Sequence, residues 1–188
     1  MSRRIRRRHV GGLLGLLIAL IAAIISRYPA ASTSLANSQP GLYKITHIND
    51  GDTIVVDIDG KKETIRLIGA DTPEVKDPRK PVQCFGEAAS AHTKQLLTGK
   101  SVRLVSDPLD SDRDKYGRLL RYVLLPDGTD YNASLIRDGY GFAYVVFPYQ
   151  KIDEYRKLEH EARLANRGLW AGCGVDSTTK IEQTTNTK

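Results

Sequence analysis

The sequence predicts a small β-barrel with added helices, and three observations support that prediction. Three short runs with β-branched residues, joined by Asp-Gly turns, open the region that should fold. Two further runs of this kind follow, and segments with helical features lie before the first of them and after the second. The chain has 188 residues, which is enough for one domain with a proper core.

The first three predicted strands form a meander. Turn residues separate them at Asn49-Asp50-Gly51 and at Asp59-Gly60-Lys61. The strands themselves are expected at Tyr43–Ile48, Thr53–Ile58 and Glu63–Gly69.

The rest of the folded body mixes helices and strands. Ala89, His92 and Leu96 recur at helical spacing, and Gly99 marks the end of that helix. The expected helices are Gly86–Leu97, Asn132–Asp138 and Ile152–Asn166, the further strands are Val102–Ser106 and Leu119–Leu125, and Gly141–Phe147 is an extended aromatic stretch. Together these elements predict a five-stranded barrel of OB type with three helices, over residues 41–174.

The first 26 residues are typical of a targeting segment. Arginines within positions 3–8 precede an apolar run of 16 residues from Val10 to Ile25, as in secretory signals. That run is long for a signal and short for a span of roughly 20 residues, so residues 1–26 are either a signal peptide or a membrane anchor. In both cases the body is expected to be exported, secreted or periplasmic, or tethered to the outer face of the membrane. Residues 27–40 are expected to be a linker and residues 175–188 a disordered polar tail.

The charge of the chain is unevenly placed. The formal charge is +6, but residues 1–40 hold six arginines and no acid. Without those six, the 28 Lys and Arg become 22, which equals the 22 Asp and Glu. The body is therefore formally neutral, and any affinity for phosphate must come from local placement of charge.

Two cysteines, Cys84 and Cys173, occur in the predicted body. An exported body permits oxidation, so we expect one disulfide between them, with two unrelated thiols as the alternative. Metal binding by thiolate is not expected, because neither cysteine has a partner at zinc-like spacing.

Three acidic runs hold the residues with the most chemistry. They are Asp50-Gly51-Asp52-Thr53, Asp71-Thr72-Pro73-Glu74 and Asp114-Lys115-Tyr116-Gly117-Arg118. Taken singly, each is an ordinary turn. Arg66 lies in an apolar strand before the second run, where its charge is costly unless it meets carboxylates or a ligand, or snorkels at a sheet edge. Together the runs supply carboxylates for a hard divalent cation, a carboxylate for the proton of an attacking water, and arginines for phosphate oxygens.

With these runs in this order, the sequence resembles the staphylococcal nuclease (thermonuclease) family. The matching strings are Asp50–Thr53, Arg66–Glu74, Phe85-Gly86 with Ala89-Ser90, Asp114–Arg118 and Ala143–Val145. The resemblance covers about Tyr43 to Trp170. It implies an OB barrel with three helices and a Ca²⁺-dependent endonuclease that hydrolyses phosphodiester bonds of DNA and RNA and leaves 3′-phosphates.

The resemblance also implies a role for each matching residue. The metal ligands would be Asp52, Asp71 and the backbone carbonyl of Thr72, with Asp50 as an acid behind them. The catalytic residues would be Glu74, which orients or deprotonates the attacking water, and Arg66 and Arg118, which contact the scissile phosphate. The substrate-binding residues would be Lys115, Tyr116 and Tyr144, which line the pocket for the terminal phosphate and base.

Two features depart from the family pattern. Val146 and Phe147 stand where the family has a second tyrosine and a lysine, so base stacking is expected to differ, and the neutral body predicts weaker and more local substrate binding. We expect a monomer that acts preferentially on single-stranded DNA and RNA, bound to the membrane if the first segment is uncleaved. The alternative is a catalytically weak OB module that binds single-stranded nucleic acid or protein, and a membrane-tethered structural protein is a third hypothesis. The intact set of acids and arginines favours the nuclease.

Overall fold

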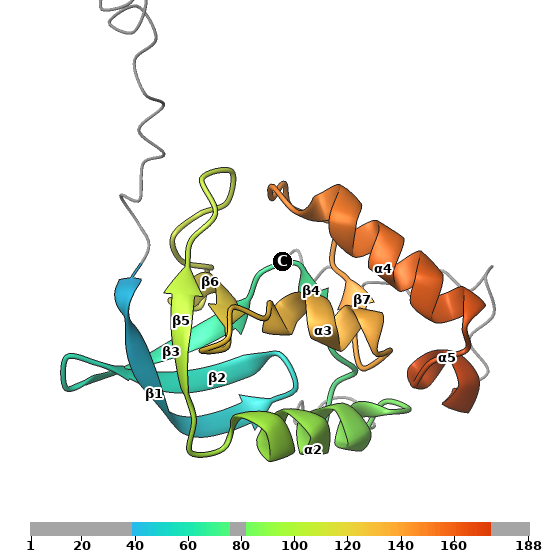
Figure 1. The fold of residues 1–188 in the computed structure, drawn as a ribbon, viewed down its shortest axis with the longest axis horizontal. Coiled ribbons are helices and arrows are strands. Elements are labelled where there is room, and N and C mark those ends of the chain that lie inside the picture. The colour runs from blue at the N-terminus through green and yellow to red at the C-terminus, as the bar shows by residue number, and fades with distance from the viewer. Residues whose placement is uncertain (1–38, 76–81, 174–188) are drawn as a thin grey trace, which may run out of the picture. The chain divides into compact units, whose positions relative to one another are not determined.

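Five strands close into a barrel in the order β1-β2-β3-β6-β5. Their bounds are β1 Gln39–Asp50, β2 Thr53–Ile58, β3 Lys61–Leu67, β5 Ser101–Val105 and β6 Leu119–Leu124. Neighbouring strands are antiparallel except β3 and β6, which run parallel, and β5 returns to pair with β1. Figure 1 shows this barrel beside the helices. The closed five-stranded barrel confirms the barrel part of the predicted fold.

The structure is a computed structural model, and it describes residues 39–75 and 82–173. The chain divides into two units, Met1–Ala36 and Asn37–Lys188. The predicted signal or anchor segment and the polar tail lie outside the described residues, as does nearly all of the linker. Within the described part of the chain, no helix is both long and apolar enough to cross a membrane.

The hairpin between β2 and β3 follows directly from its turn residues. Asp59 and Gly60 both have positive φ, at 52° and 84°, which is the conformation that Asp-Gly favours in tight hairpins. The Gly60 N–H donates to Asp57 Oδ1 at 2.8 Å, which stabilises the turn. β3 begins at Lys61, two residues earlier than expected, because pairing with β2 continues up to this turn.

The core of the barrel comes from alternate positions of its strands. Ile54, Val56 and Ile65 are fully buried, as expected where side chains alternate between the core and the surface. Fully burying an aliphatic side chain of this size is worth about 1.5–3 kcal/mol relative to exposure. These strands therefore form a rigid support for the turns at their ends.

Helices and a small second sheet extend the barrel on one side. The helices are α2 Gly86–Leu97, α3 Tyr131–Arg137, α4 Ile152–Leu164 and α5 Leu169–Gly172, and the second sheet pairs β4 Ala70–Asp71 with β7 Phe142–Ala143. α3 packs against β4, β7 and α4, and α4 and α5 lie away from β1 in Figure 1. α5 is an addition to the three expected helices, and only two residues of the expected extended stretch form a strand.

A close backbone approach fixes α5 to the rest of the domain. The Leu169 N–H donates to the Gly139 carbonyl at 2.9 Å. A Cβ on Gly168 would lie 2.2 Å from that same carbonyl oxygen, and Gly168 has a positive φ of 54°. Only glycine fits this contact without strain. Trp170 then packs edge-on against Phe142 and completes a second small core.

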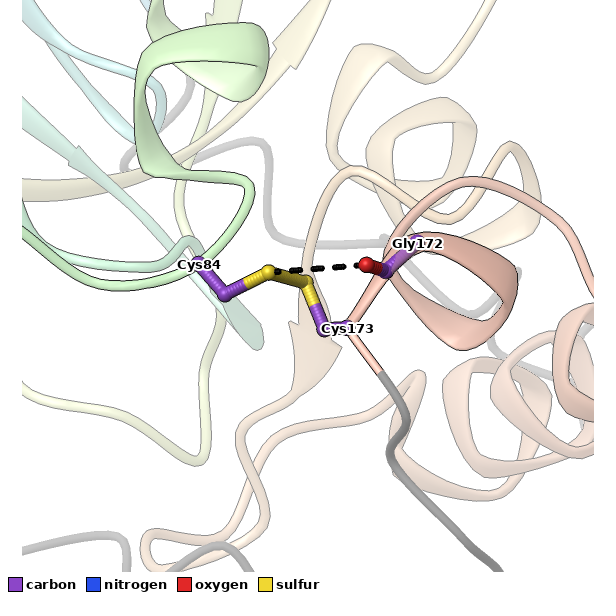
Figure 2. The surroundings of a disulfide bond; sticks show 3 residues. All are labelled: Cys84, Gly172 and Cys173. Atoms are coloured by element: carbon purple, nitrogen blue, oxygen red, sulfur yellow. Dashed lines mark hydrogen bonds between the residues drawn. A yellow bond between two sulfur atoms is a disulfide. The ribbon is translucent and has the colours of Figure 1, made fainter.

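Cys84 and Cys173 are joined by a disulfide with a Cα–Cα distance of 5.8 Å. Cys84 precedes α2 and Cys173 follows α5, so the bridge connects two segments that are 89 positions apart in sequence (Figure 2). Cys84 Sγ also lies 3.8 Å from the Gly172 carbonyl oxygen. Because a bridged sulfur carries no hydrogen, we treat this as a packing contact.

Candidate active site

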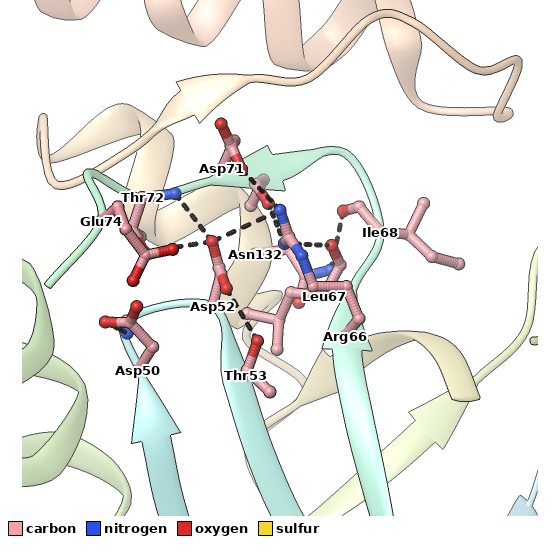
Figure 3. Close-up of polar contacts among 12 residues, drawn as sticks. Asp50, Asp52, Thr53, Arg66, Leu67, Ile68, Asp71, Thr72, Glu74 and Asn132 are labelled. Carbon is pink, nitrogen blue, oxygen red and sulfur yellow. Dashed lines mark hydrogen bonds and ion pairs between the residues drawn. The ribbon is translucent and has the colours of Figure 1, made fainter. Parts of the chain in front are cut away.

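Asp52 is the centre of a buried polar cluster at the N-terminal end of β2. It lies in the turn between β1 and β2 and is 7% exposed. Its Oδ2 accepts hydrogen bonds from the backbone N–H of Thr72 at 2.8 Å and from the Thr72 hydroxyl at 3.1 Å. Its Oδ1 accepts from the Thr53 hydroxyl at 2.9 Å. The first two acidic runs of the sequence therefore meet at this carboxylate (Figure 3).

Arg66 reaches into the same cluster from β3. Its Nη2 donates to Asp71 Oδ1 at 2.6 Å and lies 3.3 Å from Asp52 Oδ2. Its Nη1 donates to the carbonyl of Ala70 at 2.5 Å. The side chain is only 15% exposed, and its charge is met by two carboxylates. The paired interpretation of this arginine is the one that the structure shows, rather than an edge arginine extending into water.

The pKa shifts in the cluster arise because two carboxylates, Asp52 and Asp71, share one guanidinium group, that of Arg66. Burial lowers the pKa of Arg66, but the charges of Asp52 and Asp71 outweigh that effect and raise the pKa above its usual value. For Asp71, burial raises the pKa to about 6, aided by the charges of Asp52 and Glu74 and opposed by Arg66. The cluster thus contains more negative charge than Arg66 alone neutralises, which favours a bound cation.

Side chains behind the cluster hold its turns in place. Asn132 of α3 donates from Nδ2 to the carbonyl of Ile68 at 2.9 Å and accepts from the Val123 N–H at 3.0 Å. Thr93 of α2 donates to the carbonyl of Gly51 at 2.8 Å. A Cβ on Gly51 would lie 2.7 Å from the Thr72 hydroxyl oxygen, so the two acidic turns approach closely at this point.

Glu74 follows the cluster by two residues and is half-buried. Its Oε1 accepts from the Val75 N–H at 3.0 Å, and its own N–H donates to Gln83 Oε1 at 2.8 Å. In the view of Figure 3, Glu74 and Asp50 lie on one side of Asp52 and Arg66 lies on the other. The carboxylate is therefore near the cluster and held by its own turn.

Arg118 lies in a separate turn immediately before β6. Its Nε donates to Asp114 Oδ2 at 2.6 Å, and its backbone N–H donates to Asp114 Oδ1 at 3.0 Å. The pairing of β3 with β6 places Arg66 opposite Leu120. Because side chains alternate along a strand, Arg118 is near the face that carries Arg66. Among the described residues, no hydrogen bond or ion pair joins Arg118 to Asp52 or Asp71.

The expected substrate-binding residues lie in two places: Lys115 and Tyr116 in this turn, and Tyr144 directly after β7 Phe142–Ala143. Tyr116 is 67% exposed, and the charges of Lys115 and Arg118 lie 5.2 and 5.3 Å from its ring centre. Tyr144 follows β7, and its N–H donates to the Gly69 carbonyl at 2.9 Å. Its ring centre is 6.0 Å from that of Phe147, which is 57% exposed. Both groups offer accessible aromatic faces.

The residues expected to hold Ca²⁺ are chemically suited to it. Asp52 and Asp71 both contact the same guanidinium nitrogen, Nη2 of Arg66, and supply hard oxygen donors. The Asp71 side chain is 34% exposed and so reachable from water. Within the described ranges, no three His, Cys, Asp or Glu side chains form a ready metal site. Two carboxylates and one backbone carbonyl leave room for several waters, which Ca²⁺ accepts in its flexible coordination.

The structure thus brings together Asp52, Arg66, Asp71 and Thr72, and it places Arg118, Lys115 and Tyr116 in a second turn near β3. Sequence reasoning missed the supporting residues Asn132 and Gln83. Gln83 directly precedes a predicted disulfide cysteine, but its partner Glu74 lies 9 positions away in an irregular segment. No sequence period marks a contact of that kind.

The barrel and its acidic cluster define an OB-fold protein with two carboxylates and an arginine gathered at one end of its strands. A family model described as "Staphylococcal nuclease homologue" matches residues 64–172, more than half of the chain. The chain belongs to the staphylococcal nuclease family.

Individual relatives agree with this assignment. The thermonuclease of Staphylococcus hyicus is 37% identical over 164 residues, which covers 82% of this chain and 95% of the relative. The thermonuclease of Staphylococcus intermedius is 39% identical over 169 residues, covering 85% and 95%. Endonuclease YncB of Bacillus subtilis (strain 168) is 40% identical over 148 residues, covering 77% and 69%.

Proposed function

We propose that this protein is an exported Ca²⁺-dependent nuclease that hydrolyses phosphodiester bonds of DNA and RNA on the 5′ side and leaves 3′-phosphates. The observation that carries the proposal is the cluster in which Asp52 and Asp71 share Arg66, with Glu74 close by. The names thermonuclease and endonuclease of the relatives support the reaction class. Export rests on the arginines and the apolar run before residue 26.

Each group at the site has a distinct task in the reaction. When bound, Ca²⁺ supplies positive charge for the phosphate and a place for the attacking water. Asp52 and Asp71 hold the cation, and Thr72 orients Asp52 through two hydrogen bonds. Glu74 accepts a hydrogen bond from the water and takes its proton as the oxygen attacks phosphorus. Arg66 and Arg118 stabilise the charge that develops on the phosphate oxygens.

The substrate proposal rests on the exposed aromatic residues. Tyr116 and Phe147 are exposed, and Tyr144 is half-buried beside Phe147, so these rings offer faces on which bases can stack. Stacking of this kind needs bases that are already unpaired, so single strands are the preferred substrate. Stacking on a base does not depend on the 2′-hydroxyl of the sugar, which is consistent with action on both DNA and RNA.

A metal-dependent nuclease assay tests the proposal. Purified protein beginning at Asn37, the first residue of the second unit, is incubated with single-stranded DNA or RNA and Ca²⁺, with and without a chelator. Asp71→Asn should abolish most activity, whereas Asp59→Asn, at an exposed hairpin turn, is the matched control and should retain it. Undiminished cleavage in excess chelator would contradict the role of the metal.

The second candidate is an OB module that binds nucleic acid without cutting it. The neutral charge of the body beyond residue 40 makes this alternative the weaker of the two, because strong non-specific binding to phosphate needs a basic field. The same assay separates the two functions. Retention of a labelled oligonucleotide without Ca²⁺-dependent products would support the binding module.

A further inference from the structure

Glu74 is held by the segment that leads into α2. Its N–H donates to the Gln83 side chain at 2.8 Å, and its carbonyl accepts from the Gln83 N–H at 2.9 Å. These two hydrogen bonds fix both backbone polar groups of Glu74, its N–H and its carbonyl. Because the backbone orientation sets the direction of the Cα–Cβ bond, they also restrict where the Glu74 carboxylate points.

The contact between the two segments is tight. A Cβ on Gly86 would lie 2.9 Å from the Pro73 carbonyl oxygen and 3.1 Å from that of Glu74. The Gly86 N–H donates to the Gln83 carbonyl at 3.0 Å. Phe85 between them has a positive φ of 69°, a conformation that costs a non-glycine residue about 1 kcal/mol and needs surrounding support.

The support for Phe85 comes from residues in the C-terminal part of the domain. Cys84, next to Gln83, is bridged to Cys173, and the Phe85 ring packs 5.6 Å from that of Tyr140. The Phe85 ring also lies against Gly172 of α5 (Figure 2 shows this end of the helix). α5 is itself attached to Gly139 through the backbone contact described above. The bridge therefore connects the segment that holds Glu74 to the second core.

We propose that Gln83 is a positioning residue for Glu74, and that the Cys84–Cys173 disulfide keeps Gln83 in place. Hydrolysis is then faster in the oxidised protein than in the reduced one. This inference rests on the proposed function, because Glu74 acts on the water only in a nuclease. Gln83 touches the backbone of Glu74 rather than the reacting atoms, so its effect is on geometry and not on proton transfer.

The redox step needs only a dithiol such as dithiothreitol. Two thiols of the reductant give up their hydrogens and two electrons and form a cyclic disulfide. The S–S bond between Cys84 and Cys173 accepts both and becomes two thiols. Once the bridge is open, Phe85 and Gln83 lose one of the supports that hold them, and Gln83 moves more freely.

The first test compares three substitutions in the oxidised protein. Gln83→Met keeps the length of the side chain but removes the acceptor, whereas Gln83→Glu keeps an acceptor. Gln95→Met makes the same chemical change at an exposed position of α2 and is the control. We expect Gln83→Met to lower kcat about three- to tenfold, the rate equivalent of one neutral hydrogen bond. KM and Ca²⁺ affinity should stay unchanged, and both other variants should be close to wild type.

The second test asks whether the bridge acts through Gln83. Reduction, at a temperature well below the melting of the reduced protein, should lower kcat in wild type by a similar factor. In Gln83→Met it should have much less effect, because the interaction it disturbs is already absent. Equal and independent effects of reduction and of Gln83→Met would overturn the coupling, and an unchanged kcat in Gln83→Met would overturn the positioning role.

A third readout does not depend on activity. Hydrogen exchange of the Glu74 amide, followed by NMR, should be slow in the oxidised wild type and in Gln83→Glu, and fast in Gln83→Met and after reduction. If wild type does not cleave nucleic acid, the proposed function fails, while this exchange pattern still supports the structural link. Fast exchange in the oxidised wild type would overturn the inference even in an active enzyme.

Discussion

Breaking the Cys84–Cys173 bridge should remove a large part of the stability of the domain. The two cysteines are 89 positions apart. In the chain-entropy description, a closed loop of about 90 residues restricts the unfolded chain by ~15 cal/mol/K, or about 4.6 kcal/mol at 25 °C. For a domain of about 135 residues, this corresponds to a fall in Tm of about 10–20 °C.

The loss should be concentrated in the C-terminal part of the domain. α5 has four residues, too few for a helix to be stable by its own hydrogen bonds. Without the bridge it is attached by the Gly139 contact and by the packing of Trp170 on Phe142. We therefore expect the end of the chain to open before the barrel does.

Circular dichroism during heating measures the effect. The oxidised protein is compared with the same protein in dithiothreitol and with the Cys84→Ser/Cys173→Ser double variant. The two bridge-free forms should melt together, and the reductant should not change the double variant. A reduced protein that melts within about 3 °C of the oxidised one would refute the reasoning, because it would mean a contribution under about 1 kcal/mol.

Three further predictions concern the site and its support. Glu74→Gln should lower kcat by about 10²-fold or more with little change in Tm, because it removes a proton acceptor and keeps the shape; a rate within a few-fold of wild type would exclude Glu74 from the mechanism. Calorimetry should show that Ca²⁺ binding weakens as the pH falls below about 6, because the raised pKa of Asp71 lets a proton compete with the cation there, while affinity is constant above that range; equal affinity at pH 5 and pH 7 would contradict this. Asn132→Ala should cost about 1–3 kcal/mol in urea unfolding, because it leaves the Val123 N–H and the Ile68 carbonyl buried without their partner, and a loss below about 0.5 kcal/mol would contradict that role.

Local signals were enough to predict much of the barrel. The structure has β2 at Thr53–Ile58 and α2 at Gly86–Leu97, the same bounds as expected, because an Asp-Gly turn and a glycine stop act on their immediate neighbours. The short β4, β7 and α5 could not be found in this way. Two-residue strands and a four-residue helix have no period to recognise, and they form because distant segments pack against them.

For the candidate site too, the sequence predicted some features and only the fold showed others. The sequence alone indicated three acidic runs and an arginine, Arg66, within an apolar strand, and the family resemblance supplied their roles. The sharing of Arg66 by Asp52 and Asp71 is a property of the fold, since it depends on how closely the two turns approach. The same holds for Asn132, whose partner Ile68 is 64 positions away.

What this sequence determined by itself is therefore the chemistry that is present: the oxygen donors, the arginines, the strand alternation and the two cysteines. Only the tertiary structure decided which of these groups act together, because hydrogen bonds and ion pairs extend over about 3 Å and require contacts that chain order does not specify. The clearest case is Gln83, an ordinary polar residue in the sequence. The fold places it on Glu74, beside a bridge to the far end of the domain.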